Sequence, residues 1–353
     1  MNDQFGAGRA LCIRHHRKTD GRSLWLYGRA PHEESPIGEI TGYEPGGSHL
    51  RWHPLRGEWL IVSPRRQGRT FAPTGGDNPL APARSGGPLT EIPFTAFEVV
   101  VFENRFPGLS ATAEPPPEAV WSNAQACGAC EVVVYTDDPD ASMGTLANDR
   151  RVLLLEALAD RCRHHLEQGA RFVLPFENRG AEVGATLHHP HGQIYAFPFV
   201  PAPQAAAARA YAEGYDLSRE RDAWGEVALV RDRLHASSFV PPFARFPYEC
   251  WIAPKTRRAG LGQLTATELE DVATLIGDCA QRYDRMFGRP TPYMMALHGA
   301  PAGAEARFHF TVQFYPLLRS PDRIKFLAGV EQSTGVFTVD VTPEAAARAL
   351  REA

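Results

Sequence analysis

The stretch at residues 176–197 constrains the fold of this chain more than any other. Its second part, residues 188–197, reads HHPHGQIYAF, which has the length and alternation of a β-strand. Because successive side chains of a strand point to opposite faces, we expect His189, His191 and Gln193 to share one face. The residues between them then lie on the other face.

Two imidazoles and an amide on one strand face permit three interpretations. Imidazole is neutral and nucleophilic near pH 7, which suits a histidine here to covalent phosphoryl or nucleotidyl transfer, with Gly192 allowing close approach of a phosphate. A His-x-His pair is also a common metal-binding spacing, and a polar strand face can simply be solvated. The stretch alone leaves nucleophile, metal ligand and solvated surface open.

Composition places the chain among ordinary globular proteins. Of its 353 residues, 43% are hydrophobic and 22% are charged, and the length suffices for two domains or one large one. A net charge of −4 argues against a dedicated nucleic-acid binder, and no apolar run is long enough to cross a membrane. We see no secretory signal and expect a cytoplasmic protein.

The six cysteines are scattered and do not form a disulfide framework. Cys127 and Cys130 have the C-x-x-C spacing of a redox or zinc site, but no second pair follows at zinc-finger spacing. We therefore expect ordinary thiols in a reducing cytosol.

Hydrophobic periodicity predicts the same kinds of element in both halves of the chain. Long helices are expected at residues 150–168 and 265–287, the second opening with a capping box at Thr265 and Glu268. Shorter helices are expected at residues 204–213 and after Thr342, a long loop at 72–93, and solvated surface at the basic run 14–18. Strands are expected at residues 24–27, 58–62, 97–103, 131–135, 172–175, 226–231, 238–240, 249–253, 294–297, 308–315, 323–330 and 337–339.

Each half therefore contains strands, then a helix, then strands, which is an α+β pattern and suggests a duplication. The Phe-Val-Pro run before the helix at 204–213 marks a domain boundary near residues 200–203. We predict an N-terminal extension with a short strand at residues 1–40, a first domain with the HPHGQ motif at 41–202, and a second domain at 203–353.

A set of motifs resembles the galactose-1-phosphate uridylyltransferase family of the histidine-triad-like superfamily. The motifs are PLRGEW at residues 54–59, VFEN at 101–104, FENRG at 176–180 with Gly184, HPHGQ at 189–193 and FYP at 314–316. The resemblance extends from about residue 20 to the C-terminus. It implies two histidine-triad-like domains, each an antiparallel sheet with packed helices, in a duplicated half-barrel.

The resemblance implies ping-pong nucleotidyl transfer through a covalent histidine. His191 corresponds to the nucleophile that would attack the α-phosphorus of UDP-glucose and pass the uridylyl group to a hexose 1-phosphate, galactose 1-phosphate in the family. Gln193 stands where histidine-triad hydrolases carry a third histidine, and its neutral amide favours transfer over hydrolysis. We expect a backbone carbonyl to hold the other ring nitrogen of His191, and His189 to orient the site through hydrogen bonds.

The resemblance also assigns substrate contacts. Arg66 and Arg69 correspond to arginines that reach the phosphates from the partner subunit, which implies a homodimer with a shared active site; such cations screen the repulsion between two anions. The other corresponding residues are Asn104 and Phe106 at the uridine, Asn178, Thr186 and Gln193 around the phosphates, and Lys325, Phe326 and Glu331 at the sugar.

The chain departs from the family at its zinc site. The family's ligands are a C-x-x-C pair, a distant histidine and the first histidine of HPH. The pair falls here at Asn78 and Ala81, and the distant histidine at Pro139. Only His189 remains, and one ligand cannot hold Zn²⁺.

A second, iron-type site of the family is equally incomplete. His298 remains, but the other two histidines fall at Thr311 and Gln313, and the glutamate falls in the run at residues 205–208. His309 is displaced by two residues. We therefore predict that the protein uses no metal cofactor.

The sugar end departs as well. Val330 replaces a residue that is often polar, residues 333–337 do not follow the pattern, and His188 replaces the proline before HPH. Two alternatives therefore stay open beside the uridylyltransferase. One is a nucleotidyltransferase or phosphorylase of the same fold in specialised metabolism, using ADP, GDP or another sugar phosphate. The other is a catalytically inactive protein that binds nucleotide sugars.

Overall fold

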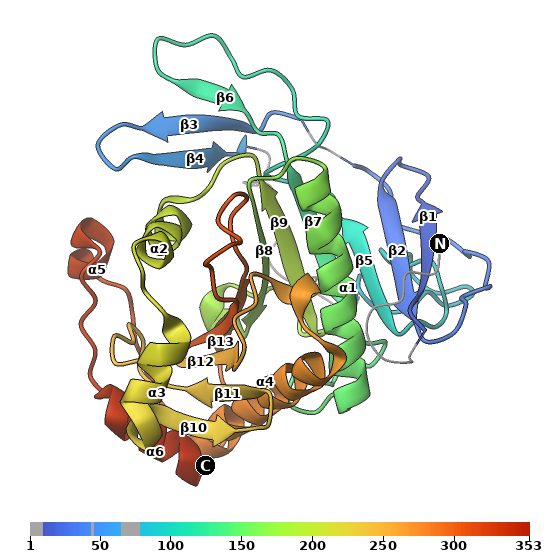
Figure 1. The fold of residues 1–353 in the computed structure, drawn as a ribbon. Coiled ribbons are helices and arrows are strands. Elements are labelled where there is room, and N and C mark those ends of the chain that lie inside the picture. Colours follow the sequence, from blue (N-terminus) through green and yellow to red (C-terminus); the bar gives the residue numbers. More distant parts are fainter. Residues whose placement is uncertain (1–9, 44–45, 65–77) are drawn as a thin grey trace.

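One large antiparallel sheet organises the computed structural model, which describes residues 10–43, 46–64 and 78–353. Its strands are β1 (Cys12–Arg17), β2 (Ser23–Gly28), β5 (Val99–Glu103), β7 (Ala129–Val134), β8 (Phe172–Arg179), β9 (His191–Phe197), β10 (Leu229–Asp232), β11 (Ala236–Phe239), β12 (Cys250–Pro254), β13 (Tyr293–His298) and β14 (Thr311–Pro316). They are hydrogen-bonded in the order β1-β2-β5-β7-β9-β8-β13-β14-β12-β11-β10 (Figure 1).

Smaller elements surround this sheet. A second sheet contains β3 (His49–His53), β4 (Glu58–Val62) and β6 (Asn123–Gln125), and β15 (Leu318–Ser320) pairs with β16 (Arg323–Ile324). The helices are α1 (Asn148–Glu167), α2 (Ala202–Ala212), α3 (Leu217–Ala228), α4 (Ala266–Phe287), α5 (Gly329–Thr334) and α6 (Pro343–Glu352), with short 3-10 turns at Ala181–Val183 and Leu261–Gln263.

The order of the strands is symmetric about the pair β8–β13. Moving outward, one side reads β8-β9-β7-β5 and the other β13-β14-β12-β11. In the chain, α1 connects β7 to β8, just as α4 connects β12 to β13. Each half is thus an antiparallel sheet with a packed helix, which confirms the predicted α+β class and gives the suggested duplication a structural form. Because the halves share one sheet, the division at residue 202 stays a prediction.

Helices α1 and α4 pack together on one face of the sheet and bury the main core with it. In α4, the Thr265 hydroxyl accepts the N–H of Glu268 and the Glu268 carboxylate accepts the N–H of Thr265, which is the predicted capping box. Gly288 ends the helix in the left-handed conformation. The opposite face of β9 is therefore the one available for a site.

Several predicted elements differ from the observed ones at the edges of the fold. Most of the basic run at residues 14–18 belongs to the edge strand β1, whose residues alternate between half-buried and exposed. Lys18 follows the strand and is buried in an ion pair with Glu91. Residues 226–228 continue α3 past a kink at Gly225, so the strand begins only at Leu229.

The predicted strands at residues 323–330 and 337–339 are wrong apart from the two residues of β16. The Glu331 carboxylate accepts the N–H of Ala328 and the ammonium of Lys325, and these local bonds turn the segment into α5. The predicted loop holds for residues 78–93, whereas residues 72–77 lie outside the described residues. No helix in the described ranges is long and apolar enough to span a bilayer.

Candidate active site

His191 is the first residue of β9 and is held in one orientation by the backbone. Its Nδ1 lies 2.8 Å from the carbonyl oxygen of His189. A carbonyl oxygen only accepts hydrogen bonds, so Nδ1 carries the proton and the neutral ring has its lone pair on Nε2. The expectation that a backbone carbonyl holds the other ring nitrogen of His191 is confirmed.

Gln193 and Asn178 share the strand face of His191. Gln193 lies opposite Phe176 on β8 and Val132 on β7, and Asn178 follows Phe176 by two residues on the same face. The structure thus brings together an imidazole and two side-chain amides, each half-buried, on the face of the sheet that α1 and α4 leave uncovered. Neutral donors around a nucleophilic nitrogen suit a phosphate group.

The strand alternation expected to place His189 beside His191 does not extend to His189. It precedes the strand, because Pro190 cannot donate a ladder hydrogen bond and β9 begins only at His191. Its side chain is 2% exposed. Nδ1 lies 2.8 Å from the amide nitrogen of Asn78, and Nε2 lies 2.7 Å from the carbonyl oxygen of Thr136.

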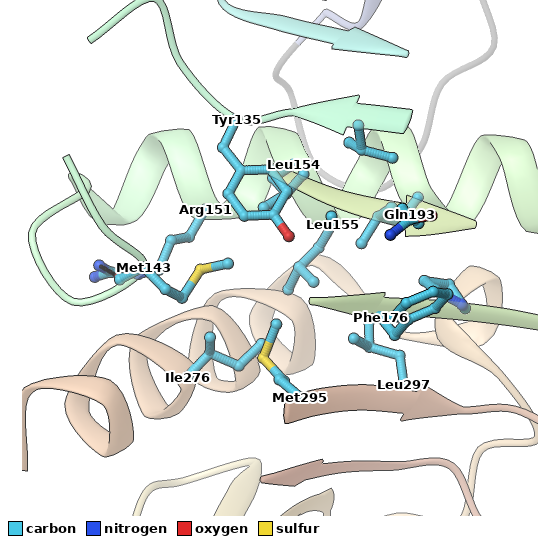
Figure 2. Close-up of a pocket in the computed structure, with 14 residues that line it drawn as sticks. Tyr135, Met143, Arg151, Leu154, Leu155, Phe176, Gln193, Ile276, Met295 and Leu297 are labelled. Carbon is cyan, nitrogen blue, oxygen red and sulfur yellow. Dashed lines mark hydrogen bonds between the residues drawn. The ribbon is translucent and has the colours of Figure 1, made fainter. Parts of the chain in front are cut away.

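The role expected for Gly192 also changes. A Cβ at Gly192 would overlap the Tyr135 hydroxyl and lie 2.7 Å from the carbonyl oxygen of Phe176. The glycine is therefore required by packing on the helix side of the sheet rather than by approach of a substrate. Figure 2 shows Tyr135 and Phe176 at the enclosed apolar cavity there, whose volume of about 10 Å³ suffices for roughly one water molecule.

Asn104 sits in a tight turn directly after β5. Its backbone N–H donates to the carbonyl of Cys130 at 2.9 Å, and its side-chain oxygen accepts the N–H of Phe106 at 2.9 Å. The turn fixes the two residues expected at the uridine relative to each other. Asn104 also lines a cleft of about 690 Å³ whose floor includes the buried ion pair of Glu131 with Arg161. Burial alone would raise the pKa of Glu131, but Arg161 and His165 lower it to about 2.

The residues expected at the sugar are bound mainly to one another. The Lys325 ammonium lies 2.9 Å from the Glu331 carboxylate and 3.0 Å from the Thr338 hydroxyl, whereas Phe326 is 74% exposed. Only the flanks of the segment, Ile324 and Phe337, pack in a cluster with Phe176 beside Gln193. Thr186 is exposed in the segment before HPH, and Arg66 and Arg69 lie outside the described residues.

The segments that carry the zinc ligands in the family come together here around His189, but the groups they offer do not fit a metal. Asn78 and the turn at residues 136–139 do converge on His189, as the resemblance requires, with an amide and a carbonyl in place of thiolate and imidazole. Both ring nitrogens of His189 are hydrogen-bonded to protein. Ala81 and Pro139 offer no side-chain ligand.

A hydrogen-bonded chain occupies the iron-type position. Nε2 of His298 lies 3.1 Å from the Tyr315 hydroxyl, which donates to the Gln313 amide oxygen, and the Gln313 amide nitrogen donates to the Thr311 hydroxyl at 2.9 Å. Burial lowers the pKa of His298 to about 4. His309 stands apart, with Nε2 donating to the Pro254 carbonyl at 3.0 Å. Within the described ranges no three His, Cys, Asp or Glu side chains cluster as metal ligands, the C-x-x-C pair included.

The sequence profile of the galactose-1-phosphate uridyl transferase N-terminal domain matches residues 41–201, and that of the C-terminal domain matches residues 208–353. The chain belongs to the galactose-1-phosphate uridylyltransferase family. The galactose-1-phosphate uridylyltransferase of Thermotoga maritima is 37% identical over 318 residues, which cover 86% of this chain and 98% of that protein. The enzyme of the same name from Streptomyces lividans is 35% identical over 331 residues, covering 86% and 87%.

A solved structure of a uridylyltransferase has the same fold, with a TM-score of 0.78 and 32% identity over 86% of this chain and 98% of the other. This member of the galactose-1-phosphate uridylyltransferase family is therefore an enzyme, a nucleotidyltransferase of the uridylyltransferase type. Motif matching predicted His191, Gln193, Asn178 and Asn104 as site residues, and their roles stay predictions. It did not find the bonding role of Asn78, whose only sequence signal was an amide in the place of a cysteine.

Proposed function

We propose that this chain transfers a uridylyl group from UDP-glucose to a hexose 1-phosphate, with galactose 1-phosphate as the expected acceptor, through a covalent uridylyl-His191. The observation that supports the proposal most directly is the 2.8 Å bond from Nδ1 of His191 to the His189 carbonyl. It selects the tautomer whose Nε2 can act as a nucleophile without prior loss of a proton.

In the first half-reaction, Nε2 of His191 attacks the α-phosphorus of UDP-glucose. A P–N bond forms, the bond from that phosphorus to the bridging oxygen breaks, and glucose 1-phosphate leaves with the electron pair. Nδ1 keeps its proton throughout, and the His189 carbonyl stabilises the positive charge that the ring acquires. In the second half-reaction, a phosphate oxygen of the hexose 1-phosphate attacks the same phosphorus and the P–N bond breaks.

Gln193 and Asn178 have the same role in this scheme. Their amide N–H groups can donate to non-bridging oxygens of the α-phosphate as negative charge accumulates there. Neither amide can act as an acid or base, so neither activates water for hydrolysis of the intermediate. A long-lived phosphoramidate needs this inertness.

We also propose a homodimer in which Arg66 and Arg69 serve the partner's site. In the sequence these arginines come four and seven residues after the end of β4, and the sheet that contains β4 lies at the margin of the molecule (Figure 1). That region exposes large apolar side chains, with Leu60 45% and Trp121 51% exposed. Exposed apolar groups on this sheet suit burial against a second copy.

The reaction is proposed to take place in the cytoplasm without a bound metal. The six thiols form no disulfide in the described structure, as suits a reducing compartment. The proposal of a metal-free state is supported by the amide, hydroxyl and carbonyl groups that stand in place of the family's ligands around His189 and His298.

Isotope exchange tests the proposed ping-pong route. Enzyme incubated with UDP-glucose and radiolabelled glucose 1-phosphate alone should move label into UDP-glucose, because the first half-reaction is reversible without the second acceptor. Failure with UDP-glucose but exchange with ADP-glucose or GDP-glucose would reassign the donor. Calorimetric binding without exchange for every donor would instead identify an inactive binding protein.

A further inference from the structure

The side chain of Asn78 is hydrogen-bonded to the ring of His189 at 2.8 Å, although 111 residues separate them. We propose that Asn78 is a positioning residue, which replaces the family's metal by a hydrogen bond and thereby fixes the nucleophile His191 through His189. The inference rests on the proposed role of His191, and it deepens that role by naming what holds the site rigid.

The orientation of the Asn78 amide is determined by a second contact. Its oxygen accepts the N–H of Leu80 at 3.1 Å, so its nitrogen faces His189. The amide nitrogen only donates, which makes Nδ1 of His189 an acceptor, and the Thr136 carbonyl only accepts, which makes Nε2 a donor. The two contacts together select one neutral tautomer of His189. A proton on Nδ1 would place two donors against each other.

The same residue supplies the carbonyl that orients the nucleophile. The His189 carbonyl accepts Nδ1–H of His191 at 2.8 Å. Pro190 lies between them, and its ring limits rotation of the backbone on both sides. Because the ring of His189 is held at both nitrogens, a shift of this residue after loss of one contact would move its carbonyl and alter the orientation of the His191 ring.

Asn78 is itself supported by buried groups. The carbonyl of Pro79 accepts the N–H of Glu91 at 2.8 Å. The Glu91 carboxylate lies 2.7 Å from the Lys18 ammonium and 2.8 Å from the Arg22 guanidinium, and all three side chains are buried. The hairpin of β1 and β2 thus anchors the segment that presents Asn78. This gives the N-terminal extension a role in the active site.

The test exchanges the donor for an acceptor of the same shape. In Asn78→Asp, the carboxylate keeps the contact to Leu80 but can only accept from His189, so Nδ1 must take a proton. We expect kcat to fall about 10- to 100-fold, as for removal of groups that orient a ligand histidine, while KM for UDP-glucose changes by less than about 3-fold. Asn123→Asp is the matched control, because the Asn123 amide at the start of β6 donates to the Pro117 carbonyl in an exposed hydrogen bond.

Nitrogen NMR of histidine-labelled protein reports which ring nitrogen of His189 carries the proton. A merely structural role of Asn78 would leave this unchanged. Wild-type His189 should show a protonated Nε2 and an unprotonated Nδ1; Asn78→Asp should show both nitrogens protonated, and Asn78→Ala a mixture of tautomers. An unchanged His189 spectrum in Asn78→Asp, or kcat equal to that of Asn123→Asp, would overturn the inference. If wild-type enzyme exchanged no donor, the proposed function would fail, whereas the His189 spectra would still decide whether Asn78 sets the tautomer.

Discussion

The Nδ1–H of His191 and the carbonyl oxygen of His189 lie 2.8 Å apart, and this pair links the chemistry of the site to its support. On the substrate side, the bond leaves the lone pair of His191 on Nε2. On the protein side, His189 is buried between Asn78 and Thr136, where the family would hold a metal. The proposed nucleophile and its support are thus the two histidines of the HPH motif, with separate tasks.

Replacing Gly192 by alanine should disturb this arrangement through a clash on the helix side of the sheet. The added methyl would overlap the Tyr135 hydroxyl and crowd the Phe176 carbonyl, so β9 must shift. We expect a loss of about 1–3 kcal/mol in the free energy of unfolding, measured in urea, with loss of most activity. Gly260→Ala is the matched control, because its Cβ meets nothing within 4 Å and its φ of −167° is extended. Equal stability of the two variants would contradict the packing role of Gly192.

Mixing two inactive variants tests whether arginines act between subunits. His191→Gly lacks the nucleophile, and Arg66→Ala with Arg69→Ala lacks the proposed phosphate contacts. If each site takes its arginines from the partner, a mixed dimer contains one complete site. Equal mixing with exchange of subunits should then restore about a quarter of the wild-type activity. Activity that stays at zero, although native mass spectrometry shows mixed dimers, would place the arginines in their own subunit's site.

Metal removal should leave the enzyme unchanged. Because Asn78 and Thr136 take both nitrogens of His189, dialysis against a strong chelator should alter neither kcat nor the melting temperature. Metal analysis of the purified protein accompanies the assay. One tightly bound zinc per chain, lost together with activity, would contradict the account.

Glu177 should make stability depend on pH between about 4 and 7. Burial raises the pKa of this carboxyl to about 7, and Arg179 offsets the effect only in part. The folded state therefore keeps the proton while the unfolded chain loses it, so the stabilisation is full below the unfolded pKa and is lost as pH rises to about 7. Glu177→Gln should be more stable than wild type by up to about 3 kcal/mol at pH 8, with little difference at pH 4. A difference that does not change with pH would refute this.

Local patterns predicted much of the fold. The capping box of α4 and the periodicity of α1 specify both long helices, and alternation specifies the central strands. The motif likewise predicted a backbone carbonyl against the ring of His191, and the bond that the structure shows joins residues only two apart. The bond from Asn78 to His189 and the burial of Lys18 against Glu91 join segments 111 and 73 residues apart, and no local pattern encodes them. The segment at residues 323–339 was mispredicted for a different reason, since the local contact between Lys325 and Glu331 outweighs its strand propensity.

Trapping the covalent intermediate tests the central claim most directly. Enzyme mixed with UDP-glucose and digested after rapid quenching should yield a peptide with residues 188–197 that carries one uridylyl group on His191. The adduct should disappear on addition of galactose 1-phosphate and be absent from His191→Gly. A uridylyl group on any other residue, or turnover by His191→Gly at the wild-type rate, would contradict the account.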